Sequence, residues 1–188
     1  MKFSNLTRTV AAVVALSVAA PAAFAQNTMV GGAEMFPNKT IVENASESAD
    51  HTTLVAAVKA AGLVETLSGE GPFTVFAPTN DAFEKLPAEA VADLLKPENK
   101  DQLTKVLTCH VVAADAMSPA IGKMIKDDGG AHPVTTLGGC VLTAEIRESD
   151  NALTLTDENG NVAVVTIPDV DQSNGVVHVI DTVMLPAS

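Results

Sequence analysis

The chain contains no tryptophan and no tyrosine, and aromatic residues make up only 3% of its 188 residues. Sugar-binding faces usually offer exposed aromatic platforms, so the composition argues against a carbohydrate site of that kind. Basic residues are also scarce: 11 Lys and Arg oppose 23 Asp and Glu, which gives a net charge of −12. Because nucleic-acid binding requires Lys and Arg to neutralise phosphates, we expect no nucleic-acid partner. Anionic lipid head groups are repelled for the same reason.

The sequence also lacks the motifs that mark common catalytic sites. It has no Gly-x-Ser-x-Gly elbow, no His-Glu-x-x-His pair, no phosphate loop and no dinucleotide fingerprint. Ser173, His178 and Asp181 lie close together in the sequence, but a catalytic triad is recognised by its three-dimensional geometry. We therefore predict that the protein is not an enzyme and uses no cofactor.

No metal site is predicted. Residues 169–175 carry oxygen-bearing side chains at alternate positions, but the glycine comes one position late and the closing glutamate of an EF-hand is missing. His110 and His178 lie in apolar stretches, with no further ligand at helical spacing. We expect both to be hydrogen-bonded structural residues. Metal ligation or a pH-sensitive contact is the alternative for these two histidines.

The first 25 residues have the three parts of a secretory signal peptide. Lys2 and Arg8 precede an uncharged run over 10–20, and small residues lead up to Ala25. A transmembrane anchor is the alternative, but the run is shorter than the roughly 20 apolar residues that a bilayer requires. We expect cleavage after Ala25, a secreted or periplasmic protein, and no membrane insertion. The remaining 163 residues suit one domain. Cleavage would remove Lys2 and Arg8 and no acidic residue, so the net charge of the mature chain would be −14.

Only two cysteines are present, Cys109 and Cys140. An even number of cysteines in an oxidising compartment usually indicates a disulfide. We therefore predict that these two are bridged, with two buried free thiols as the alternative. A bridge over this separation would stabilise the fold by roughly 3–4 kcal/mol in the chain-entropy model.

The two halves of the chain differ in their hydrophobic pattern. Residues 26–39 show no sustained period and are expected to form a flexible lead-in. Helical patterns then dominate up to residue 130, and from His132 onward β-type runs alternate with Gly, Asn and Asp turns. This succession predicts an α+β domain. The expected helices are one that follows a cap at Asp50 and ends at Gly62, then 63–67, a helical turn that follows a cap at Thr79 or Asn80 and contains Phe83 and Leu86, then 87–95, 97–108 and one that begins at 118–119 and ends at 127–130. The expected strands are 73–77, 109–112, 134–137, 141–146, 153–156, 162–167 and 176–185.

Three separated stretches resemble the fasciclin-like domain, an adhesion-associated module of secreted and surface proteins. Gly71-Pro72-Phe73-Thr74-Val75-Phe76-Ala77-Pro78-Thr79-Asn80-Asp81-Ala82-Phe83 is similar to the first signature of the family, and Asn174-Gly175-Val176-Val177-His178-Val179-Ile180-Asp181 is similar to the second. His110-Val111-Val112 resembles the central Tyr-His motif, except that Cys109 replaces the tyrosine. The similarity runs from about Thr40 to Pro186. It implies a wedge of about seven strands packed with several helices, in which His110, His178, Asn174 and Gly175 belong to structural motifs.

The resemblance also implies a function. Animal members of the family use a Pro-Asp-Ile segment just before the second signature in integrin binding, and Pro168-Asp169-Val170 is similar to it. Asp169 and Val170 are therefore candidate adhesion contacts. We expect a secreted, monomeric, non-enzymatic module that binds a cell-surface or matrix macromolecule. The alternative is an envelope or matrix protein that binds a small ligand or a cation on its acidic surface.

Overall fold

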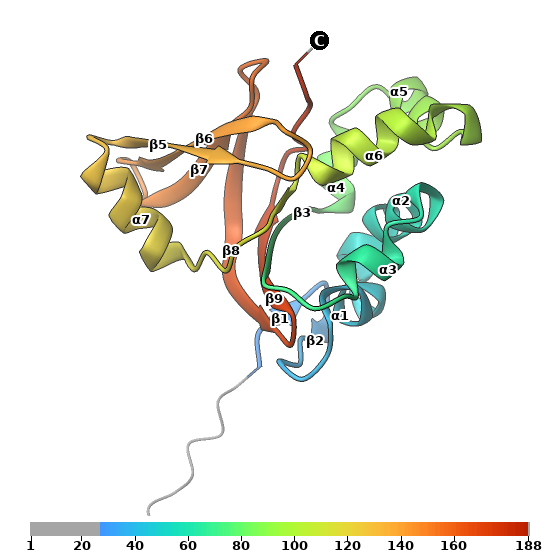
Figure 1. The fold of residues 1–188 in the computed structure, drawn as a ribbon, viewed down its shortest axis with the longest axis horizontal. Helices are drawn as coiled ribbons and strands as arrows, with labels where there is room; N and C mark the ends of the chain where they lie inside the picture. Colours follow the sequence, from blue (N-terminus) through green and yellow to red (C-terminus); the bar gives the residue numbers. More distant parts are fainter. Residues whose placement is uncertain (1–26, 188) are drawn as a thin grey trace, which may run out of the picture.

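The computed structural model describes residues 27–187, so the predicted signal peptide lies outside the described range. Helices flank a seven-stranded mixed sheet on two sides (Figure 1). This architecture confirms the predicted α+β class and the predicted number of strands in the main sheet. Within residues 27–187, no helix is long and apolar enough to cross a bilayer.

The bounds of the elements are as follows. The helices are α1 (Ile41–Glu47), α2 (Thr52–Ala61), α3 (Val64–Leu67), α4 (Asn80–Glu84), α5 (Ala88–Leu94), α6 (Lys100–Thr108) and α7 (Ser118–Asp127), with 3-10 turns at Ala49–His51 and Pro97–Asn99. The strands are β1 (Met29–Val30), β2 (Ala33–Glu34), β3 (Phe73–Pro78), β4 (Val111–Val112), β5 (Ala131–Thr135), β6 (Val141–Arg147), β7 (Ala152–Thr156), β8 (Val162–Gln172) and β9 (Gly175–Ile180).

The strand order of the main sheet is β4-β3-β9-β8-β7-β6-β5. β3 and β9 are parallel, with Phe73 opposite Gly175 and Pro78 opposite Ile180, and every other pair of neighbours is antiparallel. The two signature stretches, about a hundred residues apart in sequence, thus form adjacent strands. Their pairing connects the helical first half of the chain to the β-rich second half.

The two ends of the sheet come close together and nearly close it into a barrel. Leu137, in the β5–β6 turn, donates its backbone N–H to the carbonyl oxygen of Val111 in β4 at 2.7 Å. A disulfide between Cys109 and Cys140 joins the same two regions. Both cysteines are buried. The bridge predicted from the even cysteine count therefore joins the start of β4, at one edge of the sheet, to the β5–β6 hairpin at the other edge.

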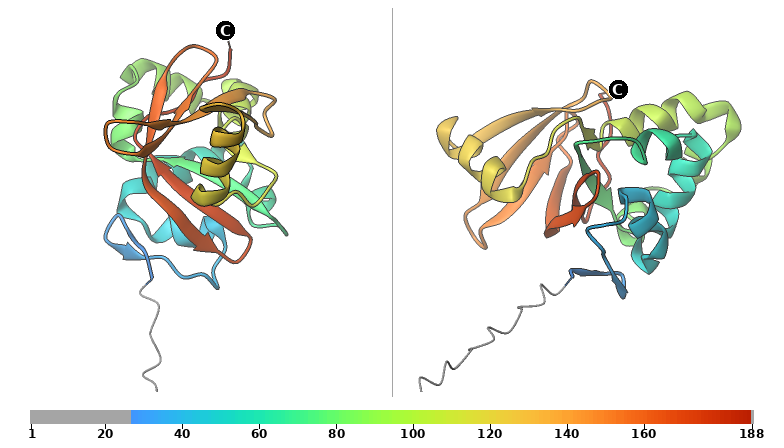
Figure 2. Two further views of the ribbon diagram at one scale, coloured as in Figure 1. Left: turned by 90° about the vertical axis from the view of Figure 1, so that its left-hand side faces the viewer. Right: turned by 60° about the horizontal axis from the view of Figure 1, so that its bottom comes forward.

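The helices cover different parts of the sheet (Figure 2). α1 to α6 lie on one side of the molecule, where buried residues of α2 and α6, such as Leu54, Val58 and Leu107, pack with Val75 of β3. α7 lies on the other side, and its Ile121 and Ile125 pack against strands β6 to β8. The described interior therefore contains two large apolar cores separated by the central strands, and a smaller third cluster formed by Val30, Met35, Val170 and Val179.

Hydrogen bonds from the first signature cap two helices at once. The Thr79 hydroxyl accepts the backbone N–H of Ala82 and so caps α4, as a threonine before a helix commonly does. Asn80, in contrast, reaches to a different helix: its Oδ1 accepts the N–H of Thr53 at the start of α2. α2 ends at Gly62, which has the left-handed φ of 74° that favours glycine.

The segment expected to be a flexible lead-in contributes to the core. Its described part contains the β1–β2 hairpin, and Val30 and Met35 are buried against Val170 and Val179. The next segment forms α1, a helix that the sequence interpretation did not include. Thr40 and Glu43 form a capping box at its start, so the Thr-x-x-Glu pattern was the available signal.

The last strand ends five residues earlier than predicted. β9 stops at Ile180, and after Asp181 donates its N–H to Val164 of β8, side chains accept the hydrogen bonds of residues 184 and 185. Met184 donates its N–H to Nε2 of His110, and Leu185 donates to the buried carboxylate of Asp157. The apolar residues at 183 and 184 are still buried, which explains why the sequence pattern continued beyond the strand.

We predict that Gly175→Ala unfolds the protein or destabilises it by more than about 4 kcal/mol in urea unfolding. A Cβ at this position would lie 1.9 Å from the carbonyl oxygen of Phe73, so β9 could not approach β3. Gly122→Ala in α7 is the matched control, because a Cβ there meets nothing within 4 Å. It should stabilise the helix by about 0.5–1 kcal/mol. Equal urea midpoints for the two variants would contradict the argument.

Candidate functional site

A groove between α7 and the ends of strands β6 to β8 lies next to the predicted contact segment. Its volume is about 890 Å³, within the general range of ligand sites. Pro168, which directly precedes Asp169, lines one end together with Ser118 and Pro119. Figure 1 shows α7 beside the strands that form the other wall. The groove and the contact segment therefore form one continuous surface.

The two walls of the groove differ in character. On the helix wall, Gly122 leaves open space, and Lys123 and Lys126 line the rim. On the sheet wall, apolar Ile146 is joined by the exposed Glu148 at the β6–β7 turn. Sequence reasoning did not identify this site, because about twenty residues of sequence separate the helix wall from the sheet wall. The only local signal was a glycine inside a helix, which often marks a packing or functional position.

Asp169 lies in a β-bulge of strand β8. Ile167 pairs with Val179 and Val170 pairs with Val177, so β8 contains one residue more than β9 across this interval. Asp169 has a φ of 57°, in the left-handed region that aspartate tolerates better than most residues. Bulges occur often beside functional sites because they redirect a side chain. Here the bulge turns the carboxylate of Asp169 towards the start of α7.

The imidazole of His178 holds the bulge in place. Its Nδ1 accepts the backbone N–H of Asp169 at 3.1 Å, and its Nε2 donates to the carbonyl oxygen of Ala116 at 2.8 Å. The ring is fully buried and stacks on Phe76 with centroids 5.6 Å apart. Burial lowers the pKa of His178, which keeps the ring neutral as these two hydrogen bonds require. The Asp169 carboxylate, 4.0 Å away, is therefore a neighbour and not a partner in an ion pair.

The carboxylate of Asp169 anchors α7. One oxygen accepts the backbone N–H of Ser118 at 2.6 Å, and the other accepts the Ser118 hydroxyl. The loop that leads into α7 is tied to β3 as well, because the Thr74 hydroxyl donates to the carbonyl of Ala114 and accepts the N–H of Ala116. The side chain of Asp169 is 31% exposed, so it also reaches the surface beside the groove.

Val170 lies in the core and not on the surface. It is 1% exposed and packs with Val30, Met35 and Val179. The side chain points inward where that of its neighbour faces outward. The role of Val170 as an adhesion contact stays a prediction, which its burial does not favour. Of the two candidates, only Asp169 presents side-chain atoms to solvent.

The remaining motif residues hold backbone segments together. Asn174 is buried; its Oδ1 accepts the N–H of Ile41 at the start of α1, and its Nδ2 donates to the carbonyls of Leu67 and Gly69. Gly175 permits the close approach of β9 to β3 described above. Neither residue has a group available to a ligand.

His110 connects α6 to the C-terminal segment. Its Nδ1 donates to the carbonyl oxygen of Val106 at 2.8 Å, and its Nε2 accepts the N–H of Met184 at 2.9 Å. Burial lowers the pKa of His110 to about 4, so the ring is neutral at physiological pH. Protonation would convert the acceptor nitrogen to a donor that faces another donor.

The three residues Ser173, His178 and Asp181 do not form a catalytic arrangement. Both ring nitrogens of His178 bond to backbone groups. Asp181 accepts the N–H of Val164 and bonds to Lys85. Burial has the largest single effect on the pKa of its carboxyl group and raises it, but the hydrogen bonds together outweigh burial and lower the pKa overall. The described residues 27–187 also contain no group of three or more His, Cys, Asp or Glu placed to hold a metal ion.

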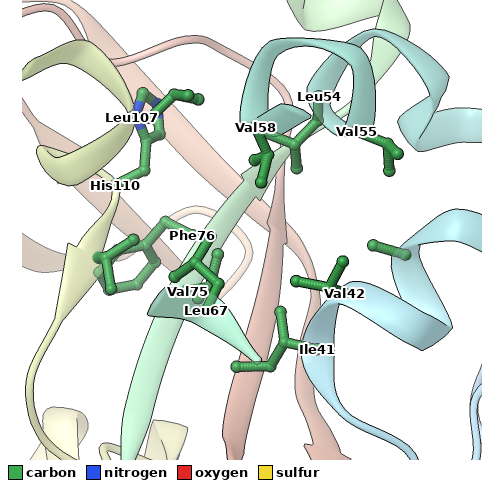
Figure 3. A pocket seen from close by; sticks show the side chains of 12 residues that line it. Ile41, Val42, Leu54, Val55, Val58, Leu67, Val75, Phe76, Leu107 and His110 are labelled. Atoms are coloured by element: carbon green, nitrogen blue, oxygen red, sulfur yellow. The ribbon is translucent and has the colours of Figure 1, made fainter. Parts of the chain in front are cut away.

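A second hollow lies inside the protein, between α1, α2 and strand β3 (Figure 3). Its lining is almost wholly apolar, and Figure 3 shows Ile41, Val58 and Val75 directed towards it. The volume is only about 40 Å³. This cavity is a packing space and is far smaller than the roughly 300–1,000 Å³ of sites for small molecules.

We predict that His110 stays neutral down to about pH 5 in the folded protein, as NMR of its ring nitrogens would show. Between pH 6.5 and 4 the unfolded chain binds a proton at this residue that the folded chain does not, so the free energy of unfolding should fall by up to about 3 kcal/mol as the pH drops through this window. A protonation midpoint near 6.5 would contradict the buried, acceptor role of Nε2.

We also predict that Asp169→Ala lowers the free energy of unfolding by about 2–3 kcal/mol. The variant loses the hydrogen bonds to Ser118 and places alanine at a left-handed φ. Asp169→Asn should cost less, because asparagine tolerates this φ and retains one acceptor. Asp171→Ala, at an exposed position of the same strand, is the control and should stay within about 0.5 kcal/mol of wild type. Equal losses for Asp169→Ala and Asp171→Ala would exclude the anchoring role.

Comparison with known proteins agrees with this geometry. The fasciclin domain matches residues 49–186. Protein sll1483 of Synechocystis sp. is 51% identical over 147 residues, which cover 78% of this chain and 73% of that protein. Cell surface glycolipoprotein MPB83 of Mycobacterium bovis is 41% identical over 124 residues, 66% of this chain and 48% of the relative.

Larger relatives contain the matching region as one part. Transforming growth factor-beta-induced protein ig-h3 of Sus scrofa is 35% identical over 150 residues, which cover 80% of this chain but only 20% of that protein. The fold matches the FAS1 domain pair of the insect cell adhesion molecule Fasciclin I with a TM-score of 0.69 and 18% identity, over 78% of this chain and 51% of that one. Since the family match covers well over half of the sequence and a relative is 51% identical, the chain belongs to the fasciclin domain family.

Proposed function

We propose that this protein is an extracellular, non-enzymatic interaction module that binds a cell-surface or matrix macromolecule through the surface formed by Asp169 and the α7 groove. Fasciclin domain proteins are adhesion-related, and MPB83, one of the relatives, is a cell surface glycolipoprotein. The predicted signal peptide supports export to the periplasm or the medium, where such a partner would be met.

One observation carries the choice of surface. Among the motif residues that the sequence singled out, His110, His178, Asn174 and Gly175 are engaged in holding backbone segments. Asp169 is the exception, because its side chain is fixed by Ser118 and is still 31% exposed. A charged group held rigidly at the surface beside a groove loses little conformational entropy on binding.

Two features of the described residues favour a macromolecular partner over a cation. The carboxylates of the described residues form no cluster of three or more suited to a metal ion. An open groove of about 890 Å³, by contrast, offers contact area to a protruding segment of another protein. A single site of this kind gives modest affinity, and several copies at one surface would increase it through avidity.

The test is binding of the mature protein to whole cells and to isolated matrix of the source. We expect Asp169→Asn to weaken binding at least fivefold, because it removes the charge at the bulge and keeps a side chain that tolerates the same backbone conformation. Asp171→Asn is the matched control, since it removes an exposed carboxylate from the same strand and should bind like wild type.

Two results would contradict the proposal. Absence of binding by the wild-type protein at any accessible concentration would exclude an adhesive role. Equal binding by wild type and both variants would show that the contact surface lies elsewhere. Circular dichroism of each variant checks that a loss of binding does not reflect unfolding.

A further inference from the structure

The groove beside α7 has the dimensions of a site for a short extended peptide. Its helix wall runs from Ser118 to Lys126, which corresponds to about 12 Å at the rise of an α-helix. An extended chain covers this length with about four residues. Gly122 lies within this wall, and the open space at its Cβ position gives room for a side chain of the partner.

Among the residues that line the groove, lysines outnumber carboxylates, in contrast to the rest of the protein. The chain has 23 acidic and 11 basic residues, yet two lysines and only one carboxylate, that of Glu148, line the groove. Lys123 is paired with Asp127 on its own helix, at a distance of 2.5 Å between Nζ and Oδ2. This pair is exposed and therefore contributes little stability, so an incoming carboxylate could compete for Lys123. Lys126 is exposed one helical turn further along the same wall.

The floor of the groove is apolar. Ile125 of α7 and Leu153 and Val165 of the sheet belong to the core beneath it, and Ile146 is partly exposed at its wall. Apolar surface at the floor and cations at one rim together fit a ligand with apolar side chains and an acidic end.

We propose that this groove binds an extended segment of a partner protein, with apolar side chains against Ile146 and Gly122 and an acidic residue at Lys123 and Lys126. The inference rests on the proposed function, because it names the part of the macromolecular partner that the surface recognises. The opposite end of the segment lies at Pro168, beside Asp169. The field of the other carboxylates is screened over about 8 Å at physiological salt, so direct contact with the two lysines decides the preference.

The probe is a dye-labelled peptide of eight residues with an apolar half of leucine and alanine and an acidic end of aspartates. Its comparison peptide has lysines in place of the aspartates. Fluorescence anisotropy should show that the mature protein binds the acidic peptide at least tenfold more tightly than the basic one. Gly122→Trp, which fills the groove, and Lys126→Glu, which reverses the rim charge, should each weaken binding of the acidic peptide at least tenfold.

Matched controls are available on α2, which lies on the opposite side of the molecule. Ala60 and Lys59 are exposed there, so Ala60→Trp and Lys59→Glu repeat the same chemical changes away from the groove. Both should bind the acidic peptide like wild type. Lys126→Glu changes an exposed side chain, so the test stands even where Gly122→Trp fails to fold.

Three results would overturn the inference: no binding of the acidic peptide up to millimolar concentration, equal binding of the two peptides, or equal weakening by groove and control variants. Binding to whole cells by the same variants separates this inference from the proposed function. Undiminished cell binding by Gly122→Trp and Lys126→Glu, with peptide binding lost, would show that the groove does not contact the cell-surface partner; the inference would then fall, and the adhesive role would stay in place through another surface. We expect the groove variants to lose both peptide binding and cell binding, and the control variants on α2 to keep both.

Discussion

The parallel pairing of β3 with β9 is the interaction on which the rest of the structure depends. It joins strands about a hundred residues apart in sequence, and it requires Gly175 because any side chain there would meet the backbone of Phe73. Hydrogen bonds lock both ends of the pair. Asn174 ties one end to α1 and α3, and at the other end Thr79 donates its N–H to the carbonyl of Ile180. Each of the two signature segments thus provides one half of this pair.

The candidate binding surface is built outward from the same pair. His178 projects from β9 and accepts the N–H of the extra residue in the β8 bulge, and Asp169 in that bulge anchors the start of α7. Thr74 of β3 fixes the loop that leads into the same helix. The position of α7, and with it the groove, is therefore determined by residues of the central strands. A rigid frame of this kind suits the proposed role in recognition.

Much of the fold was predictable from local pattern. The period of the apolar residues identified α2, α6 and α7, and the run of β-formers at 73–77 identified β3. Two cysteines in a chain predicted to be exported identified the disulfide. The errors arose where a partner distant in sequence decides the outcome. Residues 183–185 keep a strand-like pattern, but Met184 and Leu185 donate to His110 and Asp157 instead of to a strand. The segment before residue 40 shows no period yet buries Val30 and Met35.

The candidate site was less predictable than the fold. The resemblance singled out Asp169 and Val170, but only the register of β8, with its bulge between Ile167 and Val170, shows that the first is partly exposed and the second is buried. The groove depends on how α7 lies against three strands, and no local pattern encodes that arrangement. Gly122, Lys123 and Lys126 read in sequence as ordinary positions on the polar face of an amphipathic helix.

The most direct test of the account is hydrogen–deuterium exchange of the mature protein, free and bound to cells or matrix. The account predicts that binding slows amide exchange in α7, in the β6–β7 turn and at the Pro168–Asp169 bulge, while α2, α5 and α6 exchange as in the free protein. Slowed exchange confined to the helices on the opposite side of the sheet would contradict it.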